Sequence, residues 1–244
     1  MHYFGGKFRI AGQLGEVINA MIKPGQTYHE PFCGAINVAT KISGPRELLL
    51  SDFHPYLIAM WEGALFGVDF PDTVSEDDYR YVRLNKDINP GLTGFVGFGC
   101  SFAGKFFHGY ARDVKGESGG RSFSLAAKRG IKKKLDLIKA NGNSPAFIHG
   151  CYDKIEIPDN CLIYCDPPYA SSQERYGGAG AFDHQEFNTY CKRMIQQGHT
   201  VLVSEYLENV PGDARILLSI PSKKSMRNKS GEQINTTEVL YTFN

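Results

Sequence analysis

The stretch Cys161-Leu162-Ile163-Tyr164-Cys165, followed by Asp166-Pro167-Pro168-Tyr169, decides the fold. The first five of these residues form an unbroken apolar run, which is typical of a fully buried strand in a parallel sheet. Asp166–Tyr169 therefore follows the carboxyl end of a strand, where open α/β sheets bind their ligands. We expect an α/β fold with a functional site at this edge of the sheet.

The tetrapeptide Asp166–Tyr169 combines rigidity, negative charge and an aromatic ring. Two successive prolines fix φ near about −65° and restrict the residue before them, so the carbonyl groups have few orientations. A fixed carbonyl and the Asp166 carboxylate suit the two hydrogens of an exocyclic amino group, and Tyr169 suits stacking on the ring that carries it. Taken alone, the motif is more often an acidic, proline-rich turn than a functional site.

The composition is that of a globular protein. A chain of 244 residues forms one large domain, or one domain with an insertion. Hydrophobic residues make up 42% and charged residues 22%, which excludes a disordered chain. The net charge of +1 does not by itself indicate an anionic partner.

Cysteine usage and hydropathy indicate a compartment. The six cysteines include no CxxC pair, so we expect free thiols in a reducing cytoplasm and neither disulfides nor a zinc site. No apolar stretch has the length needed to cross a bilayer. Because a functional motif begins at Tyr3, no secretion signal is expected either. The predicted location is cytoplasmic, and no metal is expected.

Two further motifs lie near the start of the chain. In Tyr3-Phe4-Gly5-Gly6-Lys7, the glycines allow close approach of the backbone to a ligand that the lysine ammonium reaches, although a flexible terminal turn is the alternative. Glu30-Pro31-Phe32-Cys33-Gly34 then predicts a short strand, a tight turn at Gly34 and a helix running to about Ile42. Strand, glycine turn and helix form the nucleotide-binding geometry of doubly wound folds.

Residues 47–52 predict a second strand that ends at Asp52. An acid at this place holds the two ribose hydroxyls of a nucleotide in such folds, and Phe53 is placed to cover an adenine face. Further helices are expected near residues 13–22, 55–67, 124–140 and 184–197, and further strands at 146–149, 199–206, 215–220 and 239–243. About seven strands with helices between the early ones predict a mostly parallel, doubly wound sheet. The glycine-rich residues 171–182 are expected to form a substrate-covering loop.

Residues 66–144 differ in composition and are expected to form an insertion between residues 1–65 and 145–244 of the α/β domain. Basic residues interleaved with aromatics and glycines indicate a surface for a phosphate backbone, although a solvated basic helix is the alternative. The candidate DNA-binding residues are Lys105, Arg112, Lys132, Lys133 and Lys134 in the insertion, and Lys223, Lys224, Arg227 and Lys229 in a late basic loop.

In this order, the motifs at residues 3–7, 30–38, 52, 152 and 166–169 resemble those of the Dam-like (alpha-group) DNA adenine-N6 methyltransferases. Residues 95–105 and 203–206 are also similar, so that the resemblance covers nearly the whole chain. It implies a seven-stranded, Rossmann-like sheet that binds S-adenosylmethionine, with an inserted, mainly helical target-recognition domain. It also implies a catalytic role for Asp166, Pro167, Pro168 and Tyr169, and cofactor contacts for Tyr3, Lys7, Glu30, Phe32, Gly34, Asp52, Tyr152 and Asp166.

Three positions depart from the pattern of the family. Ile36 stands where the cofactor turn usually has a further glycine, and Cys151 stands where an acid often precedes the position of Tyr152. Tyr3 replaces a frequent tryptophan. The first two departures put the cofactor affinity in doubt, whereas no catalytic group is lost.

The function that the resemblance implies is site-specific transfer of a methyl group from S-adenosylmethionine to N6 of a flipped adenine in double-stranded DNA, by a monomer without a metal. Methylation of another planar amine, such as cytosine N4, an RNA adenine or a glutamine side chain, is one alternative. A DNA-binding protein that has lost methylation is the other, with Ile36 and Cys151 as its support. The recognition sequence and any companion restriction enzyme stay open.

Overall fold

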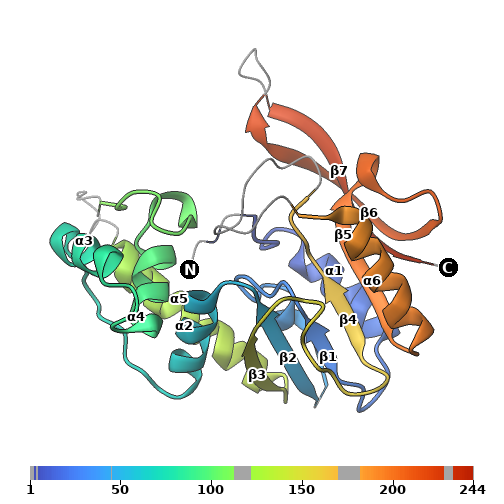
Figure 1. The fold of residues 1–244 in the computed structure, drawn as a ribbon, viewed down its shortest axis with the longest axis horizontal. Helices are drawn as coiled ribbons and strands as arrows, with labels where there is room; N and C mark the ends of the chain where they lie inside the picture. The colour runs from blue at the N-terminus through green and yellow to red at the C-terminus, as the bar shows by residue number, and fades with distance from the viewer. Residues whose placement is uncertain are drawn as a thin grey trace.

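The computed structural model describes Tyr3 and residues 5–44, 46–112, 122–169, 182–227 and 233–243. Its centre is a seven-stranded sheet in the order β3-β2-β1-β4-β5-β7-β6 (Figure 1). The strands are β1 (Tyr28–Glu30), β2 (Glu47–Asp52), β3 (Ser144–His149), β4 (Leu162–Cys165), β5 (Thr200–Tyr206), β6 (Ala214–Arg227) and β7 (Gln233–Phe243). The first five strands in the spatial order pair in parallel, and β7 runs antiparallel to both of its neighbours. The predicted α/β fold with a mostly parallel seven-stranded sheet is confirmed.

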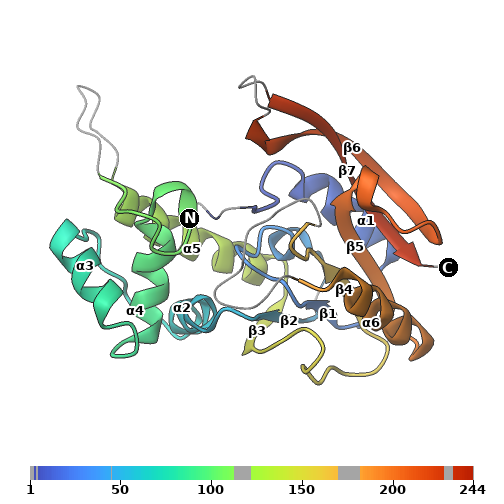
Figure 2. The same cartoon turned by 45° about the horizontal axis from the view of Figure 1, so that its top comes forward.

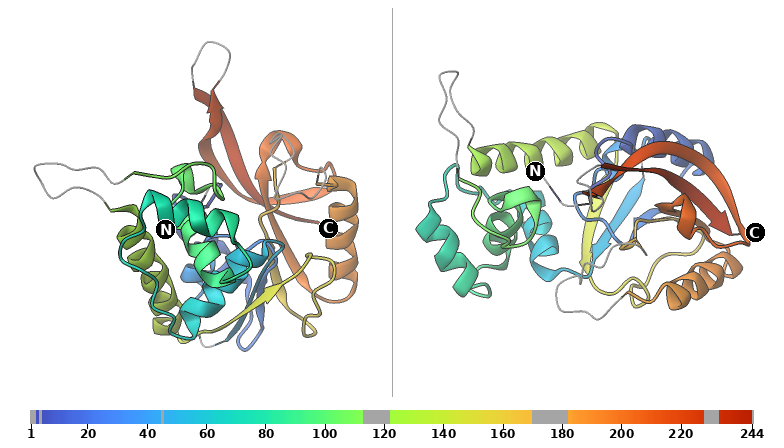
Figure 3. Two further views of the ribbon diagram at one scale, coloured as in Figure 1. Left: turned by 60° about the vertical axis from the view of Figure 1, so that its left-hand side comes forward. Right: turned by 90° about the horizontal axis from the view of Figure 1, so that it is seen from above.

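Both faces of the sheet are covered, because successive side chains of a strand point to opposite faces. On β4, Leu162 and Tyr164 belong to the larger core cluster, together with residues of α1 (Ala11–Met21), α2 (Pro55–Leu65) and α5 (Phe123–Ala140). Ile163 and Cys165 belong to the second cluster, with residues of α6 (His184–Gln196). Seen from above, α6 lies on the opposite side of the sheet from α1 and α5 (Figure 3, right). The sheet is therefore wound on both faces, as the sequence predicts.

A helical part lies beyond the β3 edge of the sheet (Figure 1). It consists of α3 (Glu76–Leu84), α4 (Pro90–Gly94), the π-helical turn η2 (Phe95–Gly99) and the 3-10 turn η3 (Phe102–Gly104). Gly94 packs so tightly against α2 that a Cβ atom would collide with the carbonyl oxygen of Tyr56. The helix α5 then returns from this part and packs against β3 and the 3-10 turn η1 (Ala39–Lys41).

The predicted helix between Gly34 and Ile42 is wrong. Only η1 forms in this stretch, because Gly34 and Ile36 have φ angles of 44° and 50°, in the left-handed region that interrupts a right-handed helix. A β-branched residue in this region is unusual, and the side chain of Ile36 is fully buried in the larger core cluster. Packing therefore holds a turn that local propensity would not favour.

The last two strands are longer than expected. β6 and β7 pair with each other well beyond residues 215–220 and 239–243, and their hairpin rises past the sheet (Figures 1 and 2). Pro221 indicates the end of a strand in the sequence, but it pairs opposite Thr237 because β6 is the edge strand and needs hydrogen-bond donors on one side only. The predicted loop at residues 171–182 lies outside the described residues, except for Phe182, and Lys229 lies outside them too.

Candidate active site

A cavity lies at the switch point of the sheet, where β1 has β2 as its neighbour on one side and β4 on the other. Its volume is about 540 Å³, which is within the usual range for small-molecule sites. Glu30 ends β1 and Asp166 follows β4, so both carboxyl groups line the cavity. The parallel register of β1 with β4 brings these two residues to the same edge from distant parts of the sequence.

The N-terminal motif closes one side of this cavity. The Gly6 amide donates a hydrogen bond to the Tyr3 carbonyl, and the Lys7 carbonyl accepts the amide of Ala11 at the start of α1. The Lys7 side chain is 9% exposed, and its Nζ lies 2.8 Å from Oδ1 of Asp166 and 3.8 Å from Oε2 of Glu238. The same ammonium lies 4.4 Å from the centre of the Tyr169 ring. We call Lys7, Asp166, Tyr169 and Glu238 the acidic corner.

The acidic corner is held from the β6–β7 hairpin. The Tyr169 hydroxyl donates to Oε2 of Glu238 at 3.3 Å, and the Ser222 hydroxyl donates to Oε1 of Glu238 at 2.6 Å. The Tyr169 ring meets that of Tyr206 edge-on, with centroids 4.5 Å apart. Tyr169 of the Asp166–Tyr169 motif is thus held by residues of β5 and β7, which follow it later in the chain.

Charge state matters at Asp166. Burial raises the pKa of Asp166 to about 6, and the Lys7 ammonium opposes this shift. Lys7 thus favours the ionised form of this carboxyl group, which accepts hydrogen bonds. Burial raises the pKa of Glu30 further, to about 8, against the hydrogen bond that the Tyr28 hydroxyl donates to it.

The other side of the cavity is a turn at residues 33–37, which we call the Gly34 turn. The Gly34 amide donates to Oδ2 of Asp52 at 3.0 Å, and the Gly34 carbonyl accepts the indole N–H of Trp61 at 2.9 Å. A Cβ atom on Gly34 would come within 2.9 Å of the Tyr3 ring. Glycine is thus required here both by its positive φ and by the approach of the N-terminal motif.

Asp52 and Phe53 follow each other at the end of β2, and both line the cavity. Asp52 also accepts the amide of His54 at 2.9 Å. Burial raises the pKa of Asp52 to about 6, while the amides of His54 and Gly34 oppose the shift. The Phe53 side chain is 53% exposed, so an aromatic face is available at the mouth of the cavity.

Aromatic rings form a further wall. Phe32 lies 5.3 Å from Tyr152 and 5.8 Å from Phe182, measured between ring centroids. Cys151 and Asp153 flank Tyr152, and both line the cavity. Oδ1 of Asp153 is buried without a hydrogen-bond partner among the described residues. An acid therefore stands directly after Tyr152, although the sequence has Cys151 directly before it.

The candidate DNA-binding residues lie at several places. Lys132 and Lys133 are exposed on α5, and Lys132 pairs with Asp136 at 3.2 Å. Arg112 is exposed and pairs with Glu76 at 2.9 Å, and Lys105 is half-buried after η3. Lys223 is exposed on β6, whereas the side chains of Lys224 and Arg227 lie outside the described part of the structure.

Lys134 differs from the expectation. It does not share the solvent face of α5 with Lys132 and Lys133, because its ammonium donates to the carbonyl of Ala35 in the Gly34 turn. A helix turns by about 100° per residue, so that Lys134 falls on the face of Ile131 and Ile138. The sequence contains this periodicity, whereas a prediction from charge alone groups Lys132, Lys133 and Lys134 on one surface.

Some site residues have no signal in the sequence. Glu238 and Ser222 reach the acidic corner only through the pairing of β6 with β7, and Trp61 reaches Gly34 only through the packing of α2. Among the described residues, no cluster of three or more His, Cys, Asp or Glu side chains is arranged to hold a metal ion. Within the same part of the chain, no helix combines the length and apolar character that crossing a membrane requires.

Comparison with known families adds one match. A sequence model of the D12 class N6 adenine-specific DNA methyltransferases matches residues 3–76. The matched stretch contains Lys7, the Gly34 turn and Asp52, and it ends before the Asp166 motif. It supports the adenine methyltransferase class and does not single out the Dam-like subgroup, which stays a prediction. No match was found among curated protein sequences.

Several solved structures show a distant likeness to this chain. The rRNA methyltransferase aviRa from Streptomyces viridochromogenes aligns with a TM-score of 0.43 and 13% identity, over 97% of this chain and 84% of that chain. The precorrin 8W decarboxylase from Methanobacterium thermoautotrophicum aligns with a TM-score of 0.37 and 11% identity, over 95% and 90%. Likeness at these scores does not bear on function.

Proposed function

We propose that the protein is an S-adenosylmethionine-dependent DNA methyltransferase that modifies N6 of adenine. The observation that carries the proposal is the acidic corner. There a nitrogen cation, Nζ of Lys7, lies 2.8 Å from Asp166 and 4.4 Å from the centre of the Tyr169 ring. An amino group on a flat heterocycle needs the same two partners, a carboxylate acceptor and an aromatic face. The D12-class match over residues 3–76 supports adenine as the heterocycle.

The rest of the cavity fits S-adenosylmethionine by charge and shape. Acidic residues outnumber basic ones in its lining even without the protonated Glu30, which suits a ligand with a sulfonium and an ammonium group; the acids are Asp52, Asp153, Asp166, Asp183 and Glu186, and the bases are Lys7 and Lys154. We assign the ribose hydroxyls to Asp52 and the adenine face to Phe53. Oδ1 of Asp153, which has no hydrogen-bond partner among the described residues, is a further acceptor in this lining. When bound, the cofactor supplies an electrophilic methyl group.

Asp166 and Tyr169 then account for the activation of the target. The N6 lone pair of adenine is conjugated with the ring and is a weak nucleophile. A hydrogen bond from N6 to the ionised Asp166 would favour a tetrahedral nitrogen and free this lone pair to take the methyl group, while the sulfur–methyl bond breaks and S-adenosylhomocysteine leaves with the sulfur electron pair. The surplus proton leaves N6 through the Asp166 carboxyl, whose pKa of about 6 allows it to pass the proton on to water.

We expect DNA to contact the exposed basic residues while its target base enters the cavity. An adenine within a duplex cannot present N6 to the cofactor, so the base is flipped at a cost of a few kcal/mol. Stacking on Tyr169 offsets about 1–3 kcal/mol of this cost. We assign phosphate contacts to Lys105, Lys132, Lys133 and Lys223, and target recognition to an inserted domain at residues 66–144. The α3–η3 helices of that range stand beside the catalytic sheet.

The test is methyl transfer from labelled S-adenosylmethionine to unmethylated duplex DNA, with the modified nucleoside identified by digestion and mass spectrometry. N6-methyladenine in the product supports the proposal, and N4-methylcytosine or labelled RNA would replace it by another planar amine. Single-molecule sequencing of DNA from an expressing cell gives the recognition sequence. Isothermal titration with S-adenosylmethionine is the check for a degenerate DNA-binding protein, which would not bind the cofactor.

A further inference from the structure

The segment behind the Gly34 turn is not an α-helix: the carbonyl groups of Ile36, Val38 and Ala39 accept backbone amides, whereas others lack the amide partners that a helix would supply. Side chains from and just beyond α5 take their place. Lys134 donates to the Ala35 carbonyl, and Asn141 donates to the carbonyls of Thr40 and Ile42, each at 3.1 Å. Lys134 thus supports the Gly34 turn, and Asn141 supports the segment that follows it.

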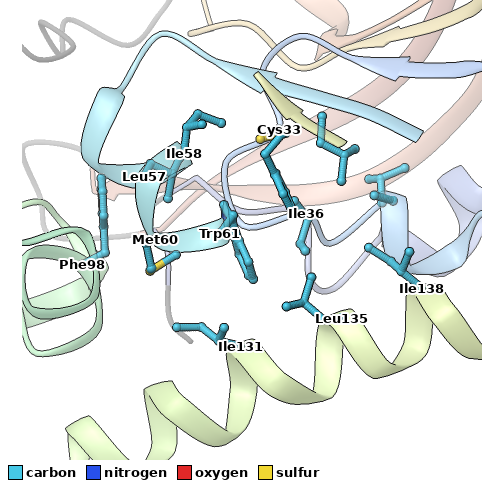
Figure 4. Packing of buried hydrophobic residues seen from close by; sticks show 14 of the residues in the cluster. Cys33, Ile36, Leu57, Ile58, Met60, Trp61, Phe98, Ile131, Leu135 and Ile138 are labelled. Atoms are coloured by element: carbon cyan, nitrogen blue, oxygen red, sulfur yellow. The ribbon is translucent and has the colours of Figure 1, made fainter. Parts of the chain in front are cut away.

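Burial of the Lys134 side chain is unfavourable in free energy, because it removes a charged group from water. Ile131, Leu135 and Ile138 on the same face are buried, and they point toward Ile36 and Trp61 (Figure 4). The Lys134 ammonium lies 6.0 Å from the centre of the Trp61 ring, and burial lowers its pKa to about 8, with Glu30 opposing the shift. An apolar side chain of equal length would fill the space without the cost of removing a charge from water. Stability alone does not account for a lysine here.

The turn that Lys134 holds is the one that faces the cavity. Ala35 and Gly34 line the cavity, and the neighbouring Gly34 carbonyl is fixed by Trp61 in a similar way. The opposite face of α5 carries Arg129, Lys132 and Lys133, which are exposed. Two lysines next to each other in sequence therefore lie in different environments, one against the cavity wall and one in solvent.

We propose that Lys134 is a positioning residue, which holds the Ala35 carbonyl and thereby sets the shape of the Gly34 turn for the cofactor. The inference rests on the proposed function, because it takes the ligand of the cavity to be S-adenosylmethionine. This role depends on the hydrogen bond that the Lys134 ammonium donates, and not on the overall positive charge of α5. Lys134 therefore acts on cofactor affinity, whereas Lys133 acts on DNA affinity.

The experiment compares Lys134→Met with Lys133→Met, a matched control that removes the same charge from the next position of the helix. Calorimetric titration with S-adenosylhomocysteine is expected to show a loss of about tenfold or more for Lys134→Met, the scale of one charge-assisted hydrogen bond. Lys133→Met should bind S-adenosylhomocysteine like the wild type. In fluorescence anisotropy with a labelled duplex and no cofactor, the pattern should reverse, with DNA affinity lowered in Lys133→Met only.

Two further measurements separate positioning from folding. Lys134→Met should unfold at a temperature no lower than the wild type, because the buried charge is gone, and Lys134→Arg should restore cofactor affinity because it keeps a donor. Equal affinity of wild type and Lys134→Met for S-adenosylhomocysteine, or equal losses in the Met and Arg variants, would overturn the inference. Failure of the wild type to bind S-adenosylhomocysteine would instead refute the proposed function.

Discussion

The two sides of the cavity are built in different ways. The Gly34 turn and Asp52 come from two neighbouring stretches of sequence, and they are joined by a backbone amide that donates to a carboxylate. The acidic corner brings together the N-terminus, the end of β4 and the late strand β7 through contacts between side chains. The first side is a local motif that a short stretch encodes, whereas the second exists only in the folded chain. Substitutions on the two sides should therefore affect different steps.

The largest effect is expected at Asp166. Asp166→Ala removes an acceptor whose hydrogen bond is strongest when N6 is tetrahedral, so kcat should fall by about 10²- to 10³-fold with little change in KM for DNA. Asp166→Asn keeps the shape and one acceptor oxygen, and it should be slow but active. Asp159→Ala, an exposed acid before β4, is the control for the loss of one negative charge. Methyl transfer at saturating cofactor is the assay, and unchanged turnover in Asp166→Ala would refute the mechanism.

A smaller effect, confined to cofactor binding, is expected at Asp52. Asp52→Ala removes the acceptor for the Gly34 amide together with the proposed ribose contact, and cofactor affinity should fall by about tenfold or more. Turnover at saturating cofactor should stay close to that of the wild type. Glu47→Ala, at the exposed start of the same strand, serves as the comparison in calorimetric titration. A folded Asp52→Ala variant with full affinity would remove Asp52 from the site.

Lowering the pH should protonate the acids on both sides of the cavity and reduce activity, while it stabilises the folded state. The pKa values of Asp166 and Asp52 are raised by burial from 3.8 to about 6, so kcat/KM should fall about tenfold per pH unit for each group below that value. Because the folded pKa values exceed the unfolded ones, the contribution of these groups to stability is full below pH 3.8 and is lost as pH rises through about 6. Activity lost between pH 6 and 5 should thus occur without unfolding. Parallel pH profiles of rate and melting temperature check this, and a drop in activity that tracks unfolding would contradict it.

The smallest effect concerns DNA and leaves the cavity unchanged. Lys132→Met and Lys133→Met should each lower the slope of log affinity against log salt by about 0.9 if each lysine contacts one phosphate. Lys23→Met, an exposed lysine that precedes β1 at the other end of the sheet, is the charge-matched control. Anisotropy titrations over a range of salt concentrations measure the slopes. If both slopes equal that of Lys23→Met, Lys132 and Lys133 are exposed to solvent and do not contact DNA phosphates.

The difference between the two sides also explains what could be predicted from the sequence. The sheet, the Gly34 turn and the strand before Asp166 follow from apolar runs and glycine positions, which are local. The absence of a helix after Gly34 does not follow from the local sequence, because the positive φ of Ile36 depends on the burial of its side chain against α5. Lys134 was grouped with its neighbours by charge, although helical periodicity places it with Ile131 and Ile138. Glu238 carries no local signal, since its role arises from the pairing of distant strands.

The ion pair between Lys7 and Asp166 has a consequence for the arrival of the substrate. The corner already contains a nitrogen that is tethered to the same chain, and a tethered ligand acts as if it were present at a high local concentration. If the target amine takes the place proposed for it, entry is an exchange of one nitrogen for another rather than the filling of a vacant space. Selectivity at this step then depends on the stacking free energy that a flat ring gains on Tyr169 and that a flexible alkyl chain does not gain. The Lys7 ammonium and the adenine amine then compete for the Asp166 carboxylate, and Lys7 stays close to it because it belongs to the same chain.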